Sequence, residues 1–146
     1  MKKILALLLT VPLFMACAHL RESDDVDPIV QGAWVGEGRF YDRDLKQEYG
    51  NFAVAIEIHP DNSVSGNVGG ASLAAGVIKS RPNDFVIEAD LTGPVFDQGT
   101  MPGLKKDTVV FILKPPGDAG TEGNIHLKTN LFFDFSMRVG GVDLQK

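Results

Sequence analysis

The sequence is short of the residues that carry most enzyme chemistry. It contains one cysteine, one tryptophan, two tyrosines and three histidines. A single thiol can form neither an internal disulfide nor a thiolate zinc cluster. The histidines show no zinc-binding spacing, and the chain has neither a G-x-S-x-G nor a P-loop sequence. We therefore expect a non-enzymatic protein without catalytic residues, a metal ion or a cofactor.

Clustered positive charge and long apolar runs are missing as well. The chain has 14 Lys and Arg against 19 Asp and Glu, which gives a formal net charge of −5 at pH 7. Beyond the N-terminal segment, Lys105–Lys106 is the only basic pair. Nucleic-acid binding needs clustered basic charge, so we expect no nucleic-acid partner. The longest apolar run, residues 4–16, is shorter than the roughly 20 residues that span a bilayer.

That apolar run has the layout of an export signal, because two lysines precede it and the only cysteine follows it. Its end, "LFMAC", resembles the lipobox of bacterial lipoproteins, in which a small residue precedes a cysteine that becomes acylated. Ala16 fits the small position, whereas Phe14 and Met15 depart from the usual residues. The resemblance implies a cleaved signal peptide over residues 1–16 and a lipidated, palmitate-bearing Cys17. The alternatives are a secreted protein with a stray thiol and a retained membrane anchor.

Residues 17–28, "CAHLRESDDVDP", are polar and acidic and show no apolar periodicity. They predict a tether between the lipid and a folded domain. Removing the signal leaves 12 basic and 19 acidic side chains, and anionic lipid repels such a domain. We therefore expect the acyl chains on Cys17 to hold the protein at the membrane. Ala18 follows the cysteine where an Asp would favour the inner membrane, so the resemblance implies the outer membrane, on either its periplasmic or its surface face.

Residues 29–146 predict a single all-β domain. Segments such as "FAVAIEIH" at 52–59 and "FVIEADL" at 85–91 alternate apolar and polar residues, which is typical of half-buried strands. No helical period exceeds two turns. We count about eight strands with short links, which favours an antiparallel meander that forms a small barrel, with a β-sandwich as the alternative. The last strand alternates at Val142 and Leu144, and it can pair with the first strand to close the sheet.

Trp34 is the candidate structural plug. "GAW" at residues 32–34 resembles the G-x-W motif on the first strand of lipocalins, where the resemblance implies a Trp that plugs the closed end of a barrel. Gly36 and Gly38 share a strand face with Trp34, and they leave room for a sharp bend or for a facing side chain. "TVVFILK" at 108–114 is apolar on both faces, which suits a strand that is covered on both sides.

Residues 92–107 form a loop long enough to suggest a functional role. Its candidate contact residues are Phe96, Met101 and Leu104. We favour an interaction or envelope-assembly module, which would bind another envelope protein through this loop or through a free sheet edge. The alternative is a lipocalin-like carrier of a small apolar ligand or lipid. Nine phenylalanines favour a filled interior and hence the first function.

Overall fold

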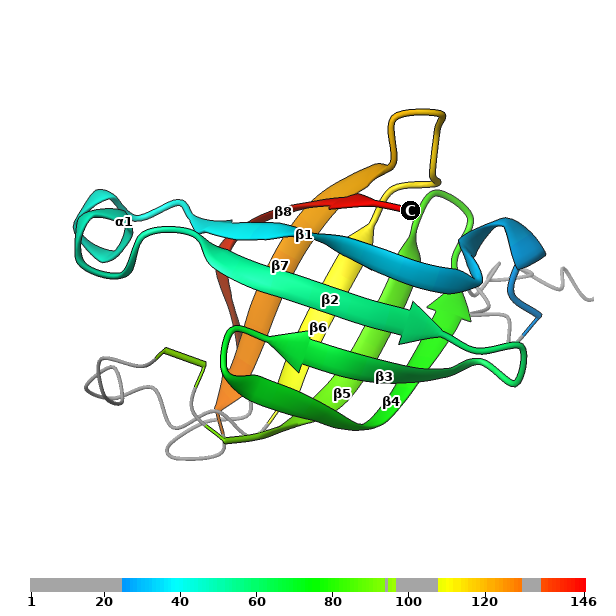
Figure 1. Ribbon diagram of the computed structural model, residues 1–146, viewed down its shortest axis with the longest axis horizontal. Coiled ribbons are helices and arrows are strands. Elements are labelled where there is room, and N and C mark those ends of the chain that lie inside the picture. The colour runs from blue at the N-terminus through cyan, green and yellow to red at the C-terminus, as the bar shows by residue number, and fades with distance from the viewer. Residues whose placement is uncertain (1–24, 94, 97–107, 130–134) are drawn as a thin grey trace, which may run out of the picture.

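The computed structural model describes residues 25–93, 95–96, 108–129 and 135–146, with the backbone alone for 127–129 and 135–139. Eight antiparallel strands follow one another in sequence order and close into a barrel (Figure 1). This confirms the all-β antiparallel barrel and rules out the sandwich. The strands are β1 Gly32–Phe40, β2 Phe52–Ile58, β3 Ser63–Val68, β4 Ala71–Ser80, β5 Phe85–Thr92, β6 Thr108–Leu113, β7 Thr121–Thr129 and β8 Phe135–Gln145.

The strands form where the sequence alternates, because successive side chains of a strand point to opposite faces of the sheet. In β2 every second residue is buried in the barrel, and the residues between them face solvent. β6 departs from this pattern because Val109 and Phe111 are fully buried inside while Val110, on the outer face, is only 8% exposed. On the outer face Val110 is thus buried, whereas Thr108 and Ile112 are half-buried, so the outer side of this strand is covered only in part.

The first and last strands close the barrel. β1 pairs with β8 in a register that runs from Val35 opposite Gln145 to Phe40 opposite Gly140. The backbones approach closely here, and a Cβ atom on Gly140 would lie 1.7 Å from the carbonyl oxygen of Arg39. Every described strand has a partner on both sides. The described strands therefore leave no free sheet edge, and the expectation of a contact surface at such an edge is wrong for this part of the chain.

Irregular pairing bends the strands so that the sheet can close. The register shifts between Val64 and Gly66 in the β3–β4 pair, and between Ala74 and Val77 in the β4–β5 pair. Within the second shift Ala75 has a φ of 50°, which is uncommon for a residue with a side chain. Bulges of this kind increase the local twist and turn the strand around the barrel.

A short helix, α1 Arg43–Tyr49, interrupts the connection between β1 and β2, and the periodicity did not predict it. Asp42 starts this helix because its side chain accepts hydrogen bonds from the backbone N–H groups of Asp44 and Leu45. Gly50 ends it with a φ of 68°. The helix is about two turns long, too short for a clear helical period. It lies at the opposite end of the barrel from the N-terminal 3₁₀ helix, η1 Pro28–Val30 (Figure 1).

Gly38 makes room for a ring, as the sequence suggested. A Cβ atom at this position would lie 2.2 to 2.9 Å from three atoms of the Phe52 ring. Gly38→Ala is therefore expected to lower the free energy of unfolding by about 1–3 kcal/mol through overpacking, and Phe52→Leu in the same chain should recover part of this loss. Urea denaturation followed by circular dichroism measures both effects.

Gly117→Ala is the matched control, because a Cβ atom on Gly117 meets nothing within 4 Å. It should leave the free energy of unfolding within about 0.5 kcal/mol of the wild-type value. If Gly38→Ala were as stable as this control, the Phe52 ring would not lie over Gly38.

Candidate functional site

The N-terminal segment covers one end of the barrel. Asp27 caps η1 by accepting a hydrogen bond of 2.9 Å from the N–H of Ile29. Val26 and Val30, on either side of this cap, are only 6% and 4% exposed and belong to the core cluster. The packed part of the chain therefore includes Val26, three residues before the domain start expected at residue 29.

Trp34 lies beneath this cover and is only 3% exposed. Its Nε1–H donates a hydrogen bond of 2.7 Å to the carbonyl oxygen of Val30, so the indole is tied to η1. Lys146 places its Nζ 5.5 Å from the centre of the indole ring, and this ammonium donates to the carbonyl oxygen of Ile29 at 3.1 Å. The first strand, the N-terminal 3₁₀ helix and the last residue therefore meet at the tryptophan.

Side chains fill the interior next to Trp34. The space bounded by residues of this end has a volume of only about 10 Å³, which is room for no more than one water molecule. Phe111, Ile87 and Ile125 are fully buried further along the barrel. Ligand clefts usually measure about 300–1,000 Å³. The interior beside Trp34 is thus a packed core with no room for a ligand of that size.

An aromatic cluster occupies the other end, near α1. It consists of Phe40, Tyr49, Phe52 and Phe96, whose ring centres lie 5.0 to 6.1 Å apart. Each such ring pair stabilises the fold by about 0.5–1.5 kcal/mol in addition to the effect of burying its apolar area. Partial burial of Tyr49, with a smaller effect of Glu48, raises the pKa of the Tyr49 hydroxyl.

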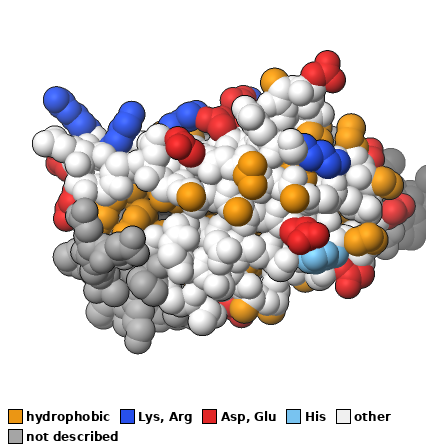
Figure 2. Space-filling model, viewed as in Figure 1, with side chains coloured by type: hydrophobic (Ala, Val, Ile, Leu, Met, Phe, Trp, Pro, Cys, Tyr) orange, Lys and Arg blue, Asp and Glu red, His pale blue; other side chains and the backbone are white. Residues whose placement is uncertain are grey.

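Of the three predicted contact residues, the structure describes Phe96, which is half-buried and packs in this aromatic cluster. Met101 and Leu104 lie outside the described residues, as does Cys17. Figure 2 shows hydrophobic side chains gathered at the α1 end.

The described residues bring together one arrangement that is reminiscent of nucleophilic catalysis. His59 Nε2 lies 3.0 Å from the hydroxyl oxygen of Ser65, and His59 Nδ1 lies 4.0 Å from a carboxylate oxygen of Glu57. The second distance exceeds hydrogen-bond length, and both His59 and Glu57 are open to solvent. Within residues 25–93, 95–96, 108–129 and 135–146, no group of three His, Cys, Asp or Glu side chains is placed to hold a metal ion.

Comparison of the chain with protein-family models, with curated proteins and with solved structures found no match. No helix in the described part of the chain is long and apolar enough to cross a membrane. The geometry of the barrel is therefore the basis for the proposed function.

Trp34→Ala is expected to lower the free energy of unfolding by about 3–5 kcal/mol, because it leaves a large cavity under η1. Trp34→Phe keeps a ring but leaves the carbonyl oxygen of Val30 without its donor. This variant should therefore lower the free energy of unfolding by a smaller amount, about 1–3 kcal/mol. Guanidinium denaturation measures both. As the only tryptophan, Trp34 should also emit at short wavelength and resist quenching by acrylamide. Emission like that of free tryptophan, with easy quenching, would contradict its position in the core.

Proposed function

We propose that this protein is a non-enzymatic, lipid-anchored interaction module of the bacterial cell envelope. The proposal rests on the packed interior beside Trp34. A carrier of an apolar ligand needs an internal cavity, whereas the space beside Trp34 measures about 10 Å³. A small barrel with a packed core and paired strands offers its outer face and its end loops for recognition. The lipocalin-like carrier is the alternative that the experiment below has to exclude.

The anchor in this proposal is Cys17, acylated and held at the outer membrane. Its support is the resemblance of "LFMAC" to a lipobox and the absence of any other cysteine. The path from the anchor to the barrel is short, because eight residues separate Cys17 from the buried Val26. Such a segment spans at most about 30 Å when fully extended. The Trp34 end therefore faces the membrane in this proposal, and the α1 end with Phe96 points away from it.

Cys17→Ala is expected to move the protein from the membrane fraction to the soluble fraction of its own envelope, because a net-negative domain has no other attachment to anionic lipid. Fractionation followed by intact-mass measurement detects both the release and the loss of the acyl mass. Ser23→Ala, in the same tether, is the matched control and should stay with the membrane.

Organic extraction of the purified wild-type protein tests the carrier alternative in the same preparation. The proposal expects no small apolar molecule at one equivalent per chain. Membrane retention of Cys17→Ala would contradict the lipid anchor, and a stoichiometric extracted ligand would contradict the interaction role.

A further inference from the structure

A groove of about 370 Å³ lies on the outer face of the barrel, along the seam where β1 meets β8. Its volume falls within the usual range of ligand clefts. Most of its lining side chains end in planar polar groups, either carboxylates, amides or a guanidinium. The lining residues are Val35, Gly36, Glu37, Arg39, Asn51, Asp143 and Gln145.

The register of the closed barrel assembles this groove from distant parts of the chain. Glu37 lies directly opposite Asp143, and Val35 lies opposite Gln145. Alternate residues of a strand share a face, so these outward side chains stand in two parallel rows. Beyond them the side chains of Tyr41 and Arg39 cover the buried Gly141, where a Cβ atom would lie 3.2 Å from the Tyr41 hydroxyl.

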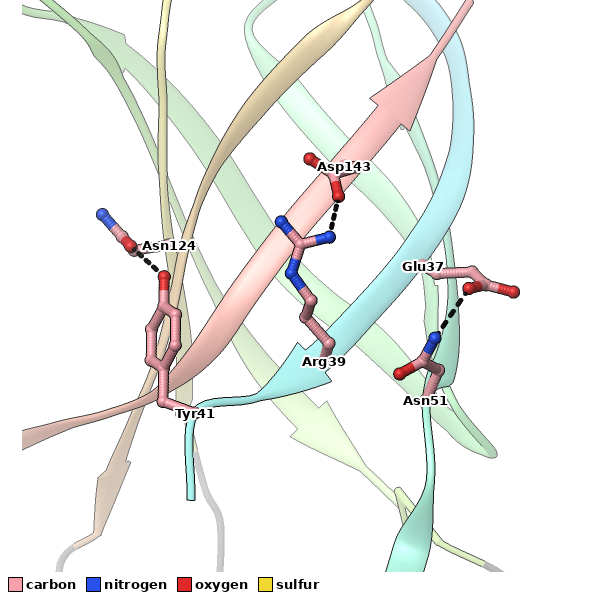
Figure 3. A network of polar contacts seen from close by, with 6 residues as sticks. All are labelled: Glu37, Arg39, Tyr41, Asn51, Asn124 and Asp143. Atoms are coloured by element: carbon pink, nitrogen blue, oxygen red, sulfur yellow. Dashed lines mark hydrogen bonds and ion pairs between the residues drawn. The ribbon is translucent and has the colours of Figure 1, made fainter. Parts of the chain in front are cut away.

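Hydrogen bonds between neighbours hold the polar groups in place (Figure 3). Arg39 forms an ion pair with Asp143. The amide of Asn51 donates to a carboxylate oxygen of Glu37 at 3.0 Å. At one end of the row, the Tyr41 hydroxyl donates to the side-chain oxygen of Asn124 at 2.8 Å. A carboxylate accepts about four hydrogen bonds and a guanidinium donates five, so the Arg39–Asp143 pair and the Asn51–Glu37 pair can each make further hydrogen bonds.

The groove lining has a net negative charge, because it holds two carboxylates, Glu37 and Asp143, and one guanidinium, Arg39. Asp143 stands between Glu37 on β1 and Glu122 on β7, and like charges that face each other across strands are unfavourable. Arg39 balances Asp143, and Lys114 binds Glu122. The hydrogen bond and the charge of Lys114, with a smaller effect of Arg39, lower the pKa of Glu122. The carboxylate of Glu37 has only the neutral amide of Asn51 as its printed partner, so the groove disfavours an anionic ligand.

We propose that this groove binds a neutral sugar chain of the cell envelope. A sugar hydroxyl both donates and accepts hydrogen bonds, and adjacent hydroxyls match the two edges of a planar carboxylate, amide or guanidinium. The C–H faces of a sugar ring need apolar surface, which Val35 offers within the groove and Tyr41 offers outside its lining, with 58% and 53% of their area exposed. This inference rests on the proposed interaction function and names its partner as an envelope glycan.

The test is co-sedimentation of the full chain, purified in detergent, with isolated peptidoglycan sacculi. Chitotetraose serves as the soluble competitor. A parallel arm uses smooth lipopolysaccharide, because both polymers present sugar chains at this location. We expect saturable binding to one of the two polymers. Chitotetraose should displace the protein from sacculi, or the free O-antigen chain should displace it from lipopolysaccharide. This binding should persist in 0.5 M NaCl, a salt level chosen to screen surface charge.

The double variant Glu37→Ala/Gln145→Ala removes two planar groups from the groove and should raise the dissociation constant at least about tenfold, since several hydrogen bonds are lost together. Both side chains are exposed, so the melting temperature should stay close to that of the wild type. Glu57→Ala is the matched control, because it removes an exposed glutamate from the outer face of β2, outside the groove lining.

Groove-dependent binding to either polymer supports the proposal and identifies the source of the glycan. The proposal is overturned if neither polymer binds, if the double variant binds as the wild type does, or if salt abolishes binding that the sugar does not displace. The protein in this test is dissolved in detergent, so failure would leave the lipid anchor of the proposed function untouched.

Discussion

The pairing of β1 with β8 closes the barrel, and both the packed core and the outer groove follow from it. It joins residues 100 or more positions apart in the sequence, from Val35 opposite Gln145 to Phe40 opposite Gly140. Closing the barrel forces the alternating apolar residues of all eight strands into one interior, where they pack against each other. It also removes the unpaired edges through which sheets aggregate or recruit another strand.

Closure has opposite consequences for the two faces of the sheet. Inside, the described side chains leave about 10 Å³ beside Trp34, and the core serves stability. Outside, the same pairing sets Glu37 beside Asp143 and forms a groove of about 370 Å³ along the seam. The interior of an eight-stranded barrel is either filled by side chains or holds one small ligand, and the described side chains beside Trp34 leave no room for a ligand. Recognition then falls to the outer face and the ends, which agrees with the interaction function that we propose.

Much of the barrel was predictable from local patterns. Alternation in segments such as "FAVAIEIH" identified the strands, and the glycines after Trp34 indicated the space that the Phe52 ring occupies. The helix α1 was not predicted, because a helix of about two turns gives no clear period in the sequence. Asp42 nevertheless provides the side chain of a typical helix cap.

The groove could not be predicted in the same way. Alternation shows that Glu37 and Asp143 face outward, and the expected pairing of the last strand with the first makes their strands neighbours. The register that sets Glu37 opposite Asp143 does not follow from alternation and comes from the structure. Of the predicted contact residues, Phe96 packs in the aromatic cluster, whereas Met101 and Leu104 lie outside the described residues.

Titration with a fluorescent fatty-acid analogue shows whether the interior beside Trp34 is filled. Trp34 is the only tryptophan and lies at one end of the interior, so a ligand that entered the barrel would alter its emission. A filled interior takes up no analogue saturably and leaves the Trp34 emission unchanged. Saturable binding of one analogue per chain, accompanied by quenching of Trp34, would contradict a filled interior.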